Sequence, residues 1–110
     1  MVAHAVQQIS KPKLNASYAA VGASDTVAYD GSGVILWLHV KNAGGSSDTV
    51  TITDPGTTPG GSAATNPSTA VANATEAFIP LLPQYANASG VIAIAHSFQT
   101  SVTCAVLRGM

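Results

Sequence analysis

Charged side chains are scarce in this 110-residue chain, because four Lys or Arg and five Asp or Glu residues make up only 8% of it. The surface of a soluble protein usually carries charge on about a quarter or more of its side chains, since charge keeps molecules hydrated and mutually repelling. Ser, Thr, Asn and Gly must hydrate whatever this chain exposes. The scarcity of charge predicts that copies of the chain or a partner cover much of its surface, and it favours a structural component over a catalyst.

The balance of charge excludes two classes of partner. The net charge is −1 and the pI is about 6.2, so no long-range field attracts phosphate groups or an anionic bilayer. Of the cations Lys11, Lys13, Lys41 and Arg108, only the first two lie close together in the sequence. Nucleic-acid binding is therefore not expected. The longest mostly apolar stretch, residues 34–40, is far shorter than the ~20 residues of a membrane-spanning helix, so no membrane partner is expected either.

Cysteine occurs once, as Cys104, so the chain forms no internal disulfide. Cys104 alternates with Val102 and Val106, which places the three side chains on one face of a strand. A nucleophilic or redox-active thiol is one interpretation of this residue. A small buried hydrophobe, a common role of free cysteine, is the favoured one.

Residues with other catalytic or metal-binding chemistry form no motif. His4, His39 and His96 share no metal-ligand spacing, so we expect polar tips at strand ends or subunit contacts rather than zinc ligands. Residues 30–33 lack the repeated acidic positions of a calcium loop, and no Gly-x-Ser-x-Gly elbow is present. The sequence therefore predicts no catalytic residue, no metal ion and no cofactor, and the chain is not expected to be an enzyme.

Short runs with the alternation of β-strands cover most of the chain, and none has a helical period. Turn residues at 31–33 and 42–47 are expected to fold neighbouring runs into antiparallel hairpins. Pro80 and Pro83 place one run at a sheet edge. The predicted fold class is all-β, a single antiparallel β-sandwich or a jelly-roll-like barrel. The expected strands are residues 25–30, 34–41 (a central strand), 48–53, 76–82, 90–96 and 101–107.

The N-terminal residues 1–14 are expected to form an extended arm, followed by a sandwich domain of residues 15–110. Pro12 opposes a helix there, and polar residues interrupt the stretch too early for a secretory leader. Apolar anchors in the arm favour strand addition to a neighbouring subunit over a disordered tail. The candidate contact residues with a partner or a second subunit are Val6, Ile9, Lys11, Lys13 and Leu14.

A long loop is predicted from residue 54 to about residue 73, where Pro, Gly, Ser, Ala and Thr predominate and apolar anchors are lacking. Loops of this length are uncommon in a compact domain and are usually functional or mobile. Two interpretations stay open for it. It either grips a neighbouring subunit or connects two strands as a flexible crossover.

The order of the motifs resembles a known family. Val-Lys-Asn-Ala-Gly at residues 40–44 is followed by Thr-Val-Thr-Ile at 49–52, by Phe-Ile-Pro-Leu-Leu-Pro at 78–83 and by two apolar runs. From about residue 13 to residue 108, this order is similar to that of small β-sandwich proteins of tailed bacteriophages, which serve as capsid decoration or minor head proteins.

The resemblance implies a virion structural protein on the capsid exterior, made in the host cytoplasm. It would bind the major capsid protein and copies of itself, with a trimer favoured, and would stabilise the shell. A tail or head–tail connector component is one alternative. A carbohydrate- or host-surface-binding module is the other, but the aromatic residues are few and spread out, and Trp37 lies in the most apolar run, which argues for a core or interface position.

Overall fold

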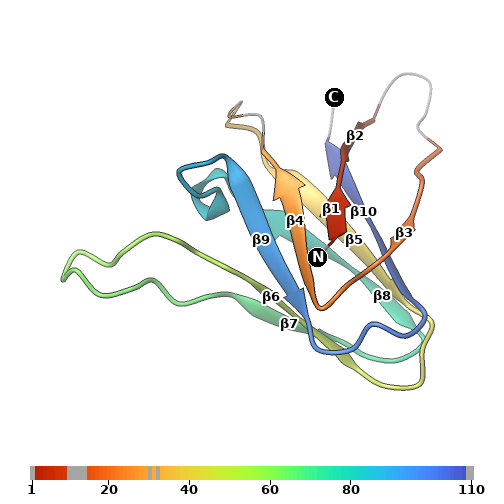
Figure 1. Cartoon of the computed structure of the whole chain (residues 1–110). Helices are drawn as coiled ribbons and strands as arrows, with labels where there is room; N and C mark the ends of the chain where they lie inside the picture. Colours follow the sequence, from red (N-terminus) through yellow and green to blue (C-terminus); the bar gives the residue numbers. More distant parts are fainter. Residues whose placement is uncertain (1, 10–14, 30, 32, 109–110) are drawn as a thin grey trace.

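The computed structural model describes residues 2–9, 15–29, 31 and 33–108, and these form two five-stranded sheets (Figure 1). The first sheet has the order β1 (Val2–His4), β4 (Ser24–Ala28), β9 (Val91–His96), β6 (Asp48–Ile52) and β7 (Ser68–Val71). The second has the order β2 (Val6–Gln8), β10 (Val102–Arg108), β5 (Leu36–Asn42) and β8 (Thr75–Leu81), and β3 (Ala19–Ala20) also pairs with β10. The prediction of an all-β fold is confirmed.

All six strands expected from the sequence are present, with ends shifted by at most two residues. β5 lies between β10 and β8, which confirms the central position predicted for residues 34–41. β8, which contains Pro80, is the edge strand that its prolines predicted. The only helix among the described residues is the three-residue 3-10 turn Pro83–Tyr85, far too short to cross a membrane.

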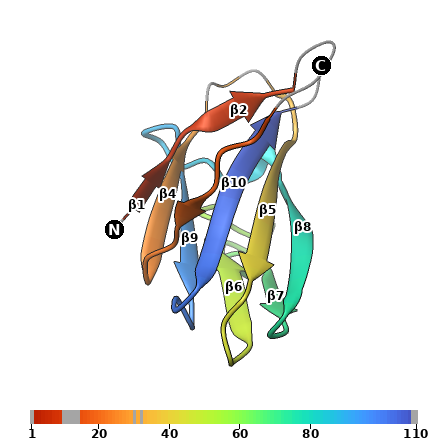
Figure 2. The same cartoon turned by 90° about the vertical axis from the view of Figure 1, so that its right-hand side faces the viewer.

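The prediction of purely antiparallel sheets was wrong at two edges. β1 pairs in parallel with β4, and β2 pairs in parallel with β10. Figure 2 shows why: the N-terminal segment runs along one side of the molecule and passes from the first sheet to the second between His4 and Val6. The described part of the expected N-terminal arm therefore pairs with strands of its own chain.

The hairpins expected around residues 31–33 and 42–47 are also wrong. β4 and β6 belong to the first sheet, whereas β5 belongs to the second, so both connections cross between sheets. Asn42 explains the second crossing, because its side-chain amide donates to the carbonyls of Ser46 and of Val71 on the far sheet. Alternation in sequence shows which face of a strand is buried, but it does not determine the neighbour with which that strand exchanges hydrogen bonds.

Part of the predicted long loop is ordered as strand. Ser68–Val71 forms β7 and pairs with β6, so the connection is an extended hairpin that projects from the two sheets (Figure 1). An isolated bridge joins Thr57 to Ala63 near its tip.

Both sheets contribute to one hydrophobic core. The inward positions of β5 and β9 alternate strictly, so that Leu36, Leu38 and Val40 are buried together with Ile92 and Ile94. Burial of side chains of this size contributes about 1.5–3 kcal/mol each. The other buried apolar side chains are Val21, Val27, Val50, Ile52, Val71, Ile79, Leu81, Tyr85, Val102, Cys104, Ala105 and Val106.

Gly44 lies in the crossing between β5 and β6, and a Cβ atom there would overlap the carbonyl oxygen of Thr100 and the ring of Phe98. We expect Gly44→Ala to destabilise the fold by roughly 1–3 kcal/mol, because the backbone of the neighbouring turn must move. Gly45→Ala is the matched control, since a Cβ atom at Gly45 meets nothing within 4 Å. Urea unfolding of both variants measures the difference, and equal stabilities would contradict the close approach.

Candidate functional site

A chain of polar side chains lies buried at one end of the first sheet. His4, Asp25, His96 and Asp48 come from β1, β4, β9 and β6, which are neighbours in that order across the sheet. Cys104, from β10 of the second sheet, lies beside His4. All five side chains occupy inward positions, and none of the five residues is more than 7% exposed.

Short contacts connect the members of this chain. Nε2 of His4 lies 2.8 Å from Oδ2 of Asp25, and Nδ1 of His96 lies 2.7 Å from Oδ2 of Asp48. The other ring nitrogen of His96, Nε2, is 3.6 Å from the same Oδ2 of Asp25. Asp25 therefore stands between the two histidines, and its Oδ2 atom faces both.

Backbone amides hold the two carboxylates in place. The N–H of Gly22 donates to Oδ1 of Asp25 at 2.9 Å, and the N–H of Phe98 donates to Oδ1 of Asp48 at 3.2 Å. Each carboxylate thus turns one oxygen toward the backbone and the other toward a histidine. Hydrogen bonds to an ionised carboxylate are about twice as strong as neutral ones, which offsets part of the cost of burying the charge.

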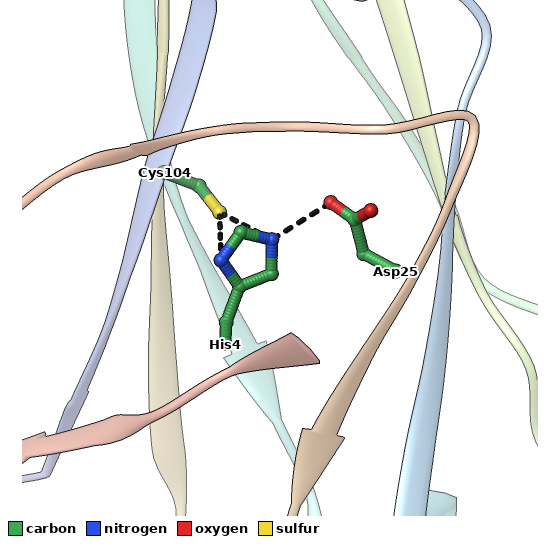
Figure 3. Close-up of side chains that lie close together, drawn as sticks. All are labelled: His4, Asp25 and Cys104. Carbon is green, nitrogen blue, oxygen red and sulfur yellow. Dashed lines mark hydrogen bonds and ion pairs between the residues drawn. The ribbon is translucent and has the colours of Figure 1, made fainter. Parts of the chain in front are cut away.

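The thiol of Cys104 lies against the imidazole of His4, with Sγ at 3.5 Å from Nε2 and 3.6 Å from Nδ1 (Figure 3). Burial raises the pKa of this thiol to about 12, and the negative charges of Asp25 and Asp48 act in the same direction. At neutral pH the group is therefore a neutral thiol. This disfavours Cys104 as a nucleophile, because the thiolate is the reactive form.

The sequence predicted the burial of Cys104 but not its polar neighbours. His96 does end a strand, as expected, but both it and His4 are buried in the interior of this chain, which was not predicted. One signal was available: His96 follows Ile92 and Ile94 at every second position, which places its side chain on the same buried face of β9. Spacing gave no signal, because His4 and Cys104 are 100 residues apart.

A cleft of about 350 Å³ leads to the cluster from outside. His4 and Cys104 contribute to its lining, together with Ala5, Gln7 and Ser17. The cleft therefore ends against the thiol and one imidazole of the cluster.

The third histidine lies on the outer side of the second sheet. His39 stacks on Phe78 with ring centroids 4.1 Å apart and planes at 9°. Its Nδ1 is 2.7 Å from the hydroxyl of Tyr18, and its Nε2 is 3.1 Å from Oε1 of Glu76. Both ring nitrogens of His39 thus have partners outside the buried cluster.

Around His39 the outer side of β5 and β8 carries exposed aromatic rings. Phe78 is 59% exposed and Trp37 is 41% exposed. Together with Tyr18 and His39 they form what we call the aromatic face. Trp37 therefore lies outside the core of this chain, and the interface position expected for it stays a prediction.

The residues predicted as contacts are placed as follows. Val6, in β2, is half-buried and packs against the core. Ile9 is 37% exposed, and its N–H donates to the carbonyl of Arg108 at 2.7 Å. Lys11, Lys13 and Leu14 lie outside the described residues. The contact role of all five stays a prediction.

Comparisons of the chain with protein-family models, with curated proteins and with solved structures gave no match. Its function is therefore inferred from its residue chemistry and its geometry.

Labelling tests the environment of Cys104. At neutral pH we expect a thiol reagent such as iodoacetamide to modify the folded, metal-free protein at least about 100-fold more slowly than the urea-unfolded chain, because the thiol is buried and uncharged. Cys104 is the only cysteine, so the mass change reports on this residue alone. Similar rates in the two states would contradict the buried, uncharged thiol.

Removal of a carboxylate tests the buried chain. Asp48→Ala leaves Nδ1 of His96 and the N–H of Phe98 without their acceptor, so we expect a loss of about 3–5 kcal/mol of stability. Asp54→Ala is the control, because Asp54 lies outside the core in the hairpin connection and its removal should cost less than about 1 kcal/mol. Denaturant titration compares the two, and a small loss for Asp48→Ala would show that the contacts contribute little.

Proposed function

We propose that the chain is a virion structural protein of a tailed bacteriophage, a capsid decoration protein that binds the major capsid protein and stabilises the shell. Its two sheets pack face to face as a β-sandwich. The functional form is a homo-oligomer, with a trimer favoured, on the capsid exterior.

The observation that carries this proposal is the aromatic face, in a chain of which only 8% is charged. Large exposed apolar side chains on a sheet are typical of protein contacts. Trp is among the residues that contribute most to such contacts, because it buries a large area at a low entropic cost. Close to the face, Lys41 and Glu76 lie opposite each other on β5 and β8 and carry opposite charges, so the partner surface should itself be apolar and nearly neutral.

Stabilisation of a shell follows from repetition. A specific contact buries on the order of 1,000 Å² or more, and capsid symmetry repeats it for every copy. A small gain per copy then becomes a large effect on rupture. No chemical step is needed, which fits the neutral thiol of Cys104.

Shell binding is the decisive experiment. Light scattering on the purified protein gives its mass in solution, and incubation with purified expanded shells gives binding and rupture temperature. We expect an oligomer, together with saturable binding that raises the rupture temperature. A stable monomer that does not bind shells would overturn the proposal, and binding to tails or to the head–tail connector instead would assign the chain to those structures.

Variants of the aromatic face locate the contact. We expect Trp37→Ala and Phe78→Ala each to weaken shell binding by roughly 10- to 30-fold, as at a central contact residue. Thr49→Ala, exposed on the first sheet, is the control and should bind like the unmodified protein. Equal binding by all three variants would place the contact elsewhere.

A second candidate function is favoured by the same rings. Exposed Trp37 and Phe78 on one sheet face also suit stacking against sugar rings, as in carbohydrate-binding modules. A glycan array with the unmodified protein separates the candidates, since a decoration protein should bind shells and no glycan.

A further inference from the structure

Three donor atoms of different chemistry meet at the end of the cleft. A ring nitrogen of His4, a carboxylate oxygen of Asp25 and Sγ of Cys104 all lie within 4.8 Å of one another, and all three residues are buried (Figure 3). An imidazole, a carboxylate and a thiolate are the three ligand types that zinc takes in proteins. A soft sulfur ligand disfavours magnesium and calcium, which prefer oxygen alone.

A separate observation points to the same place. Among the described residues, the side chain of His96 is 0% exposed, and its Nε2 atom is a buried polar atom without a hydrogen-bond partner. It lies 3.6 Å from Oδ2 of Asp25. When Nδ1 of a neutral His96 donates to Asp48, its Nε2 carries a lone pair, so two acceptors face each other at this point. A cation between them would satisfy both.

We propose that His4, Asp25 and Cys104 bind a zinc ion, with Nε2 of His96 as the fourth ligand. Asp48 then orients the fourth ligand through its contact with Nδ1, the arrangement in which a carboxylate holds a metal-bound histidine. The site is structural, because four protein ligands leave no open position.

Two of the separations between ligand atoms already match this coordination, whereas His96 lies outside the group of ligand atoms within 4.8 Å of one another and must move closer to Cys104 and His4 when zinc binds. Zinc bonds of about 2.3 Å to sulfur and 2.0–2.2 Å to nitrogen or oxygen give tetrahedral edges of about 3.5 Å for S···N and 3.4 Å for N···O. The S···N edge between Cys104 and His4 is 3.5 Å, and the N···O edge between His96 and Asp25 is 3.6 Å. The 2.8 Å contact between His4 and Asp25 is shorter than a tetrahedral edge, and it must lengthen by about 0.6 Å.

The exchange of protons and charge also balances. Zinc replaces the thiol proton of Cys104, which leaves to solvent, and the Nε2 proton of His4, which moves to Nδ1 of the same ring. One thiolate and one carboxylate then neutralise the two positive charges, and both histidines stay neutral. The zinc ion and its four ligands are then uncharged, and Asp48 beside them keeps one negative charge, held by Nδ1–H of His96 and the N–H of Phe98.

The ligands join parts of the fold that are distant in sequence. His4 lies on β1, Asp25 and His96 on β4 and β9 of the same sheet, and Cys104 on β10 of the other sheet. A bound zinc ion therefore links the two sheets and holds the N-terminal strand. The cleft lined by His4 and Cys104 provides the entry path.

Cobalt(II) is the probe for the first test, because it replaces zinc and its bond to a thiolate absorbs in the near ultraviolet. Tag-free protein is stripped with a chelator and titrated with Co²⁺, then with Zn²⁺. We expect one equivalent of Co²⁺ to produce the thiolate band and one equivalent of Zn²⁺ to abolish it. Since the chain has a single cysteine, the band identifies Cys104 without any variant.

Variants test the other ligands. We expect Cys104→Ser to lose the band, His4→Gln and Asp25→Asn to weaken zinc binding more than 100-fold, and Asp48→Asn to weaken it about 10- to 100-fold. His39→Gln is the matched control, a histidine of similar burial outside the cluster, and should bind zinc normally. Saturating zinc should raise the Tm of the unmodified protein by at least about 5 °C.

Two results would overturn the proposal. The first is the absence of both the thiolate band and a zinc-dependent rise in Tm in the unmodified protein. The second is zinc binding that Cys104→Ser retains or that His39→Gln abolishes. The first result would make the cluster a metal-free network of paired carboxylates and histidines, and the second would place the zinc ion on other residues. Shell binding does not enter these measurements, so they are independent of the function proposed above.

Discussion

The carboxylate of Asp25 is the feature on which the rest of the structure depends. A buried charge is tolerated only when several partners surround it, and here Gly22, His4 and His96 approach it from three sides. These contacts require β1 to lie beside β4 and His4 to point inward. The parallel pairing of the N-terminal segment is thus coupled to the need to satisfy one acidic group.

The burial of acidic side chains also lowers the number of charges on the surface. Two of the five acidic residues, Asp25 and Asp48, are almost completely buried, so the surface has even fewer charges than the composition suggests. On the outer side of β5 and β8, aromatic rings occupy positions where a typical soluble protein would place charged ones. The polar titratable side chains of the cluster therefore lie in the interior, and large aromatic rings lie on the surface. The interior holds the proposed zinc ligands, and the exterior carries the aromatic face.

Much of the fold could be predicted because a strand with one buried face has a period of two. The alternation in residues 34–41 and the prolines around residue 80 correctly indicated a central and an edge strand. The pairing of strands could not be predicted in this way. Turn residues suggested hairpins at 31–33 and 42–47, but the chain crosses between sheets at both places. At the second, the side chain of Asn42 donates to two backbone carbonyls, one of them on the opposite sheet.

The sequence by itself determined the all-β class, the inward position of Cys104 and the scarcity of surface charge, since these depend on local alternation and on composition. Only the tertiary structure decided that Cys104 and His4 meet, because their 100-residue separation is bridged by the parallel pairing of β1 and β2 at two sheet edges. It also decided that Trp37 faces outward beside Phe78. Contacts between distant strands depend on which sheet each strand joins, and no short motif encodes that choice.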